Sequence, residues 1–278
     1  MVPKSQKSSP VNLNTFLSTH AVFSVKDVQQ FLAEHGSTNP KTRKALLSYH
    51  RSRGRILPIR RGLYASIPSG YALVSYAVDP VLIAAKMADD SVIAYHTALE
   101  YHGKAYSRYN RMVFFSDSRT PTTEFRGTEY MRIAHPSGLR AAGKTKYGVE
   151  SHHRDGVVVR VTNHERTLVD VLDRPDVSGS WEEIWRSLEM IEFFDLDQVV
   201  QYVELLENAT TAAKVGFYLN QHRDELMADD KTFAELKTMI PKQPHYMDRG
   251  ARKGCRLISE WNLLVPRQVL DRSWEEVL

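Results

Sequence analysis

The chain lacks several features that would place it in a familiar class. Its 278 residues include a single cysteine, Cys255, which excludes an intramolecular disulfide framework and is typical of a reducing compartment. No apolar run reaches membrane-spanning length, and residues 1–10 contain no hydrophobic segment of the signal-peptide kind. No glycine-rich loop of the P-loop or dinucleotide type occurs. We therefore expect a cytoplasmic protein with no membrane partner and no cofactor.

The most informative absence is that of acidic residues from one stretch. No Asp or Glu occurs between Glu34 and Asp79, although eight Lys and Arg residues lie between positions 41 and 61. Residues 1–78 contain 11 Lys and Arg against 2 Asp and Glu, a net charge of +9, whereas residues 79–278 contain 26 against 31, a net charge of −5. Such an asymmetry predicts a small module that binds a polyanion, joined to a mildly acidic globular body.

Two helices are predicted before and within this basic stretch. Ser24 and Asp27 have the spacing of a capping box, and Gly36 is a suitable end for the helix that follows. Asn39 and Pro40 then supply an N-cap and a first helical residue for a second helix, which carries most of the basic residues. The residues expected on its buried stripe are Ala45, Leu46 and Tyr49.

A basic hairpin is predicted directly after the second helix. Extended segments at 55–59 and 63–66 flank a turn at 60–62. Helix, turn, basic helix and hairpin is the order of a winged helix-turn-helix, which we expect over residues 11–67 with a first helix at 11–20. A solvated charged face is the alternative, but the lack of acidic partners favours double-stranded DNA as the ligand. The predicted DNA-contacting side chains are Lys41, Thr42, Arg43, Lys44, Ser48, Arg51, Arg53, Arg55, Arg60 and Arg61.

The remainder of the chain predicts a larger mixed α/β C-terminal domain, so the expected fold class is α+β. We expect a flexible arm at residues 1–10, a linker at 68–78 and the C-terminal domain at 79–278. Strand-like runs rich in Val, Phe, Tyr and Ile come first, and helical spacing dominates afterwards. The expected helices are 80–87, 91–103, 163–173, 180–193, 195–207 and 211–226, and the expected strands are 111–116, 124–134 and 157–161.

Residues 162–170 resemble a catalytic constellation but have a structural explanation. Thr162 and Glu165 have the spacing of a capping box at a helix start. Arg166 and Asp170 are four residues apart on the same predicted helix, where their side chains can pair. The capping account explains the His-Glu-Arg triplet in this segment without a substrate, so we expect it to be structural.

The enzyme and metal templates also find no convincing match. Asp229, Asp230, Glu235 and Lys237 imitate the carboxylate and lysine set of DNA-cleaving enzymes, but they sit too close together on one polar, helical stretch. The adjacent pair His152-His153 lies on an extended segment, where neighbouring side chains point to opposite faces. We expect no catalytic residue and no metal site.

A second basic cluster occurs near the C-terminus. It is expected either to contact the DNA backbone or to meet an acidic partner, and a solvated loop is the alternative. Its members are Lys242, Arg249, Arg252, Lys253 and Arg256.

Five segments, in this order along the chain, give it a resemblance to a known family. They are Phe23–Val28 (FSVKDV), Arg61–Tyr64 (RGLY), Asp79–Ala84 (DPVLIA), Ala94–Gly103 (AYHTALEYHG) and Val161–Asp170 (VTNHERTLVD). Together they resemble the antitoxins of AbiE abortive-infection systems, which are type IV toxin–antitoxin regulators of phage defence. The likeness extends over most of the chain.

The resemblance implies both a fold and a function. It implies an N-terminal winged helix that represses its own operon, usually at inverted repeats, and a C-terminal domain that counteracts a nucleotidyltransferase-like toxin encoded on another chain. None of the five segments is a catalytic signature, and we expect no enzymatic activity. The alternatives are a protein-interaction module, a phosphotransfer activity on the toxin, and a nuclease targeted by the winged helix.

Overall fold

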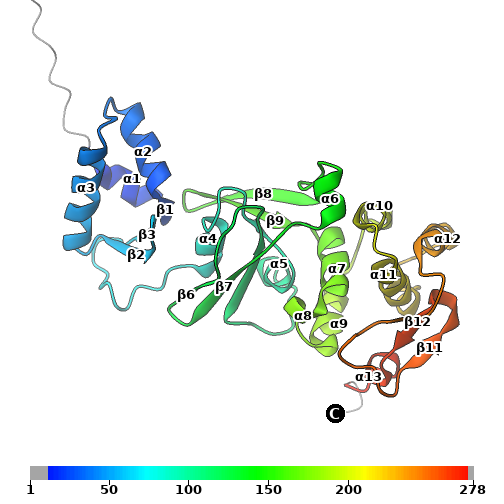
Figure 1. Cartoon of the computed structure of the whole chain (residues 1–278). Coiled ribbons are helices and arrows are strands. Elements are labelled where there is room, and N and C mark those ends of the chain that lie inside the picture. Colours follow the sequence, from blue (N-terminus) through cyan, green and yellow to red (C-terminus); the bar gives the residue numbers. More distant parts are fainter. Residues whose placement is uncertain (1–11, 275–278) are drawn as a thin grey trace, which may run out of the picture.

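The computed structural model describes residues 12–274, so the arm expected at residues 1–10 lies outside the described residues. Three groups of elements follow one another along the chain and lie in a row, as Figure 1 shows. We call them the N-terminal module (residues 12–66), the sheet module (residues 80–162) and the C-terminal module (residues 163–274). Each module contains both helices and strands, so the fold is of the mixed α+β class.

The N-terminal module joins three helices to a small antiparallel sheet. Its elements are α1 (Leu13–Thr19), β1 (Val22–Ser24), α2 (Val25–Glu34), α3 (Pro40–Ser52), β2 (Ile56–Arg60) and β3 (Leu63–Ser66). Strand β3 is central and pairs with both β1 and β2. The predicted capping box is confirmed, because Ser24 Oγ accepts from the backbone of Asp27 and the Asp27 carboxylate accepts from the backbone of Ser24. Phe16, Phe23 and Leu32 pack the helices onto the sheet.

Residues 67–79 connect the N-terminal module to the sheet module without a helix or a strand. The guanidinium of Arg126 holds this segment by donating to the backbone carbonyls of Leu73 and Tyr76. The middle of this connecting segment is therefore attached to the sheet module.

The sheet module is built on a six-stranded sheet of mixed direction. Its strands are β4 (Val92–Ile93), β5 (Arg111–Phe115), β6 (Thr123–Phe125), β7 (Thr128–Ile133), β8 (Val149–Arg154) and β9 (Val157–Thr162), and its helices are α4 (Pro80–Ala85), α5 (His96–Tyr101) and α6 (Ser137–Ala141). The strand order is β6-β7-β5-β4-β9-β8, in which β5 is parallel to β7 and β4 is parallel to β9.

Three sequence predictions for the sheet module are corrected by the structure. The helix expected from 91 begins only at His96, because residues 92–93 form β4, a short buried strand between β5 and β9. The strand expected at 124–134 is a hairpin that turns at Arg126 and Gly127, both of which have positive φ. Strand β8 includes the segment around His152-His153 that was expected to be extended, but its bounds were not predicted, because nearly all of its residues are exposed and polar, which hides the apolar alternation of a strand.

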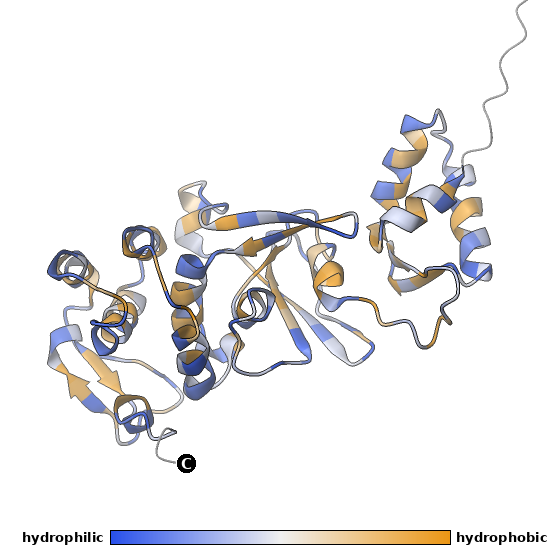
Figure 2. Ribbon diagram, turned by 180° about the vertical axis from the view of Figure 1, so that it is seen from behind, coloured by the Kyte–Doolittle hydropathy of each residue, from blue (hydrophilic) through white to orange (hydrophobic). Residues whose placement is uncertain are grey.

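The C-terminal module is mainly helical and ends in a small three-stranded sheet. Its elements are α7 (His164–Asp173), α8 (Pro175–Ser178), α9 (Trp181–Glu189), α10 (Leu196–Leu206), α11 (Ala209–Gln221), α12 (Asp230–Met239), β10 (His245–Tyr246), β11 (Arg256–Ile258), η1 (Ser259–Trp261), β12 (Leu263–Val265) and α13 (Arg267–Leu270). Hydrophobic residues gather on the surfaces where these elements face one another (Figure 2). No helix among residues 12–274 is long and apolar enough to cross a membrane.

The start of α7 differs in part from the prediction. The N-cap is Asn163, whose side chain accepts from the backbone of Arg166, so the expected capping box of Thr162 and Glu165 is wrong. Thr162 belongs to the end of β9 and is fully buried there. The predicted pair of Arg166 and Asp170 is confirmed, with Nε 3.3 Å from Oδ2 and both side chains buried.

Candidate nucleic-acid interface

Helix α3 buries a different stripe from the one expected. Leu46 and Leu47 pack against the core of the N-terminal module and His50 is buried. Ala45 is exposed, and Tyr49 is 54% exposed, so both lie on the outer face. The expected stripe of Ala45, Leu46 and Tyr49 is therefore wrong at two of its positions. Two adjacent leucines fit either choice of face, and only the packing against α1 and α2 decides between them.

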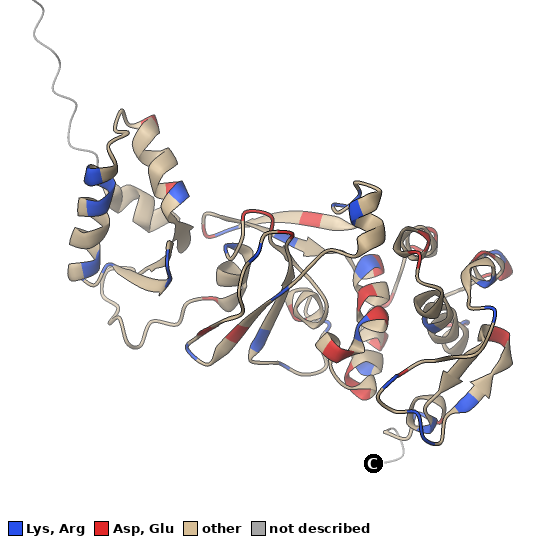
Figure 3. Cartoon of the chain, in the orientation of Figure 1, with Lys and Arg blue, Asp and Glu red and all other residues tan. Residues whose placement is uncertain are grey.

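The outer face of α3 carries a row of cations without partners. Lys41, Lys44, Arg51 and Arg53 are exposed, as is Ser48 between them. None of these four cations makes an ion pair or a side-chain hydrogen bond with another residue of the described chain, and Arg53 packs its guanidinium over the Tyr49 ring at 5.4 Å. Helix α3 contains no acidic residue, and Figure 3 shows only basic and uncharged residues along it. We call this surface the α3 face.

Three other predicted DNA contacts on or near α3 are only partly exposed, and one of them binds a neighbouring helix. Arg43 Nη1 donates to Gln29 Oε1 of α2 at 2.6 Å, and Thr42 is partly buried. Arg55 is also partly buried, with its Nε enclosed. Burial, together with the charge of Arg55, lowers the pKa of His50. These side chains lie beside the α3 face and not on it.

The hairpin formed by β2 and β3 lies against the sheet module. Arg60 donates through Nη2 to the backbone carbonyl of Met87, while Arg61 is exposed. Ile59 and Leu63 pack into one hydrophobic cluster with Leu82, a residue of α4. The hairpin therefore has one side fixed to the next module and leaves Arg61 at the turn available to a partner.

Ion pairs reinforce this junction between modules. Lys86 Nζ lies 2.9 Å from the Asp27 carboxylate, and Lys26 pairs with Asp89. Burial raises the pKa of Asp27, but the hydrogen bonds from Ser24 and the Lys86 ammonium outweigh it and lower the pKa overall. Sequence reasoning did not select Lys86, because it belongs to the acidic part of the chain and no local pattern marks it.

The second basic cluster lies at the far end of the molecule. All five members are exposed, and they lie between the segment just before β10 and the start of β11: Lys242, Arg249, Arg252, Lys253 and Arg256. In Figure 1 this region and the N-terminal module stand at opposite ends of the row of modules. The cluster is therefore a separate surface and does not extend the α3 face.

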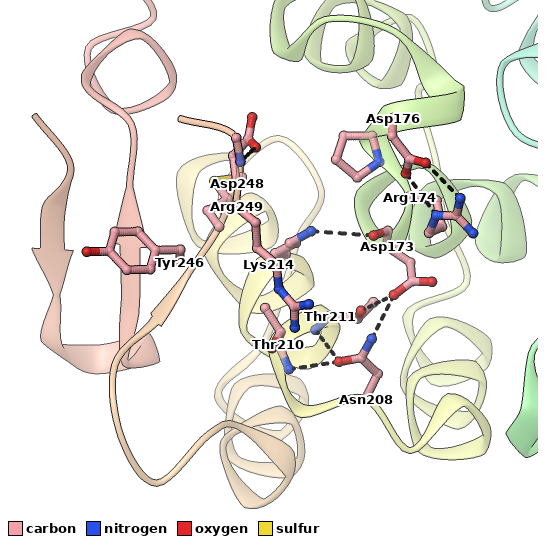
Figure 4. Close-up of a pocket in the computed structure, with 13 residues that line it drawn as sticks. Asp173, Arg174, Asp176, Asn208, Thr210, Thr211, Lys214, Tyr246, Asp248 and Arg249 are labelled. Carbon is pink, nitrogen blue, oxygen red and sulfur yellow. Dashed lines mark hydrogen bonds and ion pairs between the residues drawn. The ribbon is translucent and has the colours of Figure 1, made fainter. Parts of the chain in front are cut away.

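A cavity of about 580 Å³ adjoins this cluster and holds the buried side chain of Lys214 (Figure 4). Burial lowers the pKa of Lys214 to about 8, and its Nζ donates to the backbone carbonyl of Leu172 at 2.8 Å. Asp173 accepts from the side chains of Asn208 and Thr211. Lys214 on α11 and Asp173 on α7 each find hydrogen-bond partners across the cavity wall, and these contacts join α7 to α11. A lysine inside the apolar sequence of α11 was the signal for it.

Two further polar clusters make contacts that join elements of the fold. His96 is buried between two carboxylates, with Nδ1 3.0 Å from Glu100 and Nε2 2.9 Å from Glu183, and this arrangement ties α5 to α9. In the nuclease-like set, Asp229 caps α12 and Lys237 pairs with Glu260 at 2.7 Å. Within residues 12–274, no group of three or more His, Cys, Asp or Glu side chains is arranged to hold a metal ion.

Comparisons with known proteins bear on the fold alone. The chain matches no protein-family model and no curated protein sequence. Its fold is similar to the crystal structure of the RV2827C protein from Mycobacterium tuberculosis, with a TM-score of 0.52 and 17% sequence identity over 91% of this chain and 90% of that chain. The similarity supports the arrangement of elements along nearly the whole chain.

Proposed function

We propose that the protein is a DNA-binding regulator that reads duplex DNA with α3. The observation that carries this proposal is the α3 face, where four exposed cations make no ion pair or side-chain hydrogen bond with the described residues and the helix has no acid. Duplex DNA carries a negative charge about every 1.7 Å of its axis, and its phosphates would neutralise such a row. Lys41, Lys44 and Arg51 lie in a row on one helix face and have no partner among the described residues, so their charges are available to an external anion.

The N-terminal module is, in this proposal, a winged helix-turn-helix. The order α1-β1-α2-α3-β2-β3, with β3 between β1 and β2, supports it. Helix α3 would enter the major groove with Lys44 and Ser48 toward the bases, and Lys41 and Arg51 toward the phosphates. The hairpin would contribute Arg61 to the backbone contacts.

The regulated operon would be a toxin–antitoxin operon, as the resemblance to AbiE antitoxins implies. The N-terminal module would repress it at inverted repeats, and residues 79–278 would counteract a nucleotidyltransferase-like toxin. The position of the second basic cluster at the other end of the molecule supports this division. A partner could meet the C-terminal module while α3 remains on DNA.

The decisive experiment compares two triple variants that remove the same charge. The first is Lys41→Ala with Lys44→Ala and Arg51→Ala, on the α3 face. The second is Lys242→Ala with Arg252→Ala and Lys253→Ala, in the second basic cluster. Fluorescence anisotropy with a duplex from upstream of the protein's own gene gives Kd as a function of salt.

We expect the α3 variant to bind about 100- to 1,000-fold more weakly near 0.1 M salt and to lose about 1.8 from the slope of log K against log salt, for the two lost phosphate contacts of Lys41 and Arg51. We expect the control to keep the wild-type slope. Equal losses in both variants would show that binding follows net charge and not the α3 face. Normal binding by a folded α3 variant would contradict the proposal.

A further inference from the structure

A second basic feature lies where the N-terminal module meets the sheet module. A cleft of about 410 Å³ opens between the start of α2, the β2–β3 turn, the end of α4 and the loop that follows β5. Its charged lining consists of the cations Lys26, Arg60, Arg61, Lys86 and Arg119 and the single acid Asp89. Five positive charges against one negative charge leave an excess of four. We call this space the junction cleft.

The cations of the junction cleft fall into two groups. Lys26, Lys86 and Arg60 bind partners across the junction and hold the two modules together. Arg61 and Arg119 are exposed and make no ion pair or side-chain hydrogen bond with the rest of the described chain. They come from different modules, Arg61 from the hairpin turn and Arg119 from the loop after β5. Their guanidinium groups are therefore available to a ligand that enters the cleft from either module.

We propose that the junction cleft binds backbone phosphates of the same DNA duplex that α3 contacts. Arg61 and Arg119 supply the free guanidinium groups, which bind phosphate oxygens in a bidentate geometry. The β2–β3 turn is shared by the hairpin and the cleft, so a DNA strand that follows the hairpin passes the cleft next. The sheet module thereby extends the DNA interface beyond the N-terminal module.

The capping box of α2 limits which groups of the junction cleft can donate to a phosphate. The first turn of α2 is occupied by its own capping box, in which the Asp27 carboxylate accepts from the backbone of Ser24. The helix N-terminus is thus unavailable to a phosphate, and the binding energy must come from the arginine side chains. This makes binding in the cleft dependent on charge and independent of base sequence.

This inference rests on the proposed DNA-binding function, and one panel of variants separates the two. The test variant is Arg119→Ala, and the matched control is Arg108→Ala. Both arginines are exposed and unpaired within the described residues, and they lie just before and just after β5, at its opposite ends. The probe is a mixed-sequence duplex of roughly 30 base pairs, about three helical turns. The Lys41, Lys44 and Arg51 triple variant completes the panel.

We expect Arg119→Ala to bind about five- to tenfold more weakly near 0.1 M salt and to lose about 0.9 from the salt slope, as one phosphate contact requires. The Arg108→Ala control should match the wild type in both respects. Losses from Arg61→Ala and Arg119→Ala should add in the salt slope, since each guanidinium holds its own phosphate.

The outcomes distinguish the two proposals. Loss of binding in the α3 variant with equal slopes for Arg119→Ala and Arg108→Ala overturns the junction cleft and leaves the α3 face standing. A wild-type slope in the α3 variant with a reduced slope for Arg119→Ala overturns the α3 face and supports the cleft. Failure of the wild-type protein to bind the duplex at low salt overturns both.

Discussion

Helices α7 and α3 both carry basic side chains, but the molecule uses them in opposite ways. Arg166 in α7 is fully buried, donates through Nη1 to two backbone carbonyls at 2.9 and 2.7 Å, and pairs with Asp170. Its guanidinium also lies over the rings of Phe115 and Tyr202 at 4.9 and 5.2 Å. Lys44 in α3 is exposed and has no partner in the described chain. The contrast separates charge that the fold uses from charge that the fold leaves without a partner among the described residues.

The largest effect that this comparison predicts is on the stability of the C-terminal module. Arg166→Leu would leave Asp170 buried with only the Tyr202 hydroxyl to stabilise it, at 2.6 Å. Breaking one side of a buried pair costs about 3–5 kcal/mol, and we expect that loss in the free energy of unfolding measured with urea.

The double variant Arg166→Leu with Asp170→Leu is the control for this prediction. Removing both charges eliminates the uncompensated carboxylate, so we expect much of the lost stability to return. If the double variant were as unstable as the sum of the two single variants, the loss would come from packing and not from the buried charge.

The sequence predicted these two helices unequally. The spacing of Arg166 and Asp170 identified their pair, because a separation of four residues on a helix brings side chains together whatever lies around them. The lack of acids around α3 predicted a surface of unneutralised positive charge for the same local reason. The orientation of α3 about its axis was wrong, since Leu46, Leu47 and Tyr49 are compatible with more than one buried stripe.

The parts of the candidate site that involve long-range contacts were beyond the sequence. Arg43 was expected to reach DNA, but its guanidinium binds Gln29 on α2, and Arg60 binds a carbonyl of the sheet module. Lys86 and Arg119 lie in the part of the chain with a negative net charge, so the charge asymmetry that marked the basic stretch does not point to them. The sequence shows where the basic residues are concentrated. Only the packing of the modules shows which of these side chains have partners within the described chain and which do not.

The attachment of the N-terminal module to the sheet module gives the next largest effect. A Cβ at Gly156, in the β8–β9 turn, would lie 2.0 Å from the backbone oxygen of Thr19. Gly127, in the β6–β7 turn, has a similar positive φ but nothing within 4 Å of such a Cβ. We expect Gly156→Ala to destabilise by about 1–3 kcal/mol more than Gly127→Ala, because only the first adds a steric clash to the unfavourable φ.

Unfolding in urea, followed at 25 °C by circular dichroism, measures both glycine variants. Equal losses of stability would mean that the N-terminal module is free to move away from the β8–β9 turn. In that case the two modules would not hold the cations of the junction cleft in place. The difference between the cations that bind the sheet module and those of the α3 face would then disappear.

The pH dependence of the junction gives a smaller effect. The hydrogen bonds from Ser24 and the charge of Lys86 lower the pKa of Asp27 below its ordinary value of 3.8, against the effect of burial. Since the folded pKa is below the unfolded one, the carboxylate contributes stability that is fully present above the unfolded pKa and is lost as the pH falls through the folded pKa.

The measurement is the thermal midpoint of the wild type and of Asp27→Asn across the acidic range. We expect the difference between them to be constant above about pH 5 and to close as Asp27 is protonated. Asp89→Asn is the control, because its pair with Lys26 is largely exposed and worth little. A difference that stays the same at every pH would exclude the Asp27 charge as its source.

The smallest change in stability should come from three cations of the α3 face, because among the described residues they make no contacts that stabilise the fold. Lys41, Lys44 and Arg51 have no partner in the described chain, so replacing all three by alanine removes no contact that the fold uses. Alanine is also at least as favourable as lysine or arginine in a helix, and the change relieves repulsion among like charges. We expect the free energy of unfolding to change by no more than about 0.5 kcal/mol, measured with urea, while DNA binding falls steeply. A loss of stability above about 1 kcal/mol would show that these cations serve the fold after all. The weaker DNA binding of the variant would then result from a damaged module. The cations of α3 would stabilise the fold, as Arg166 of α7 does.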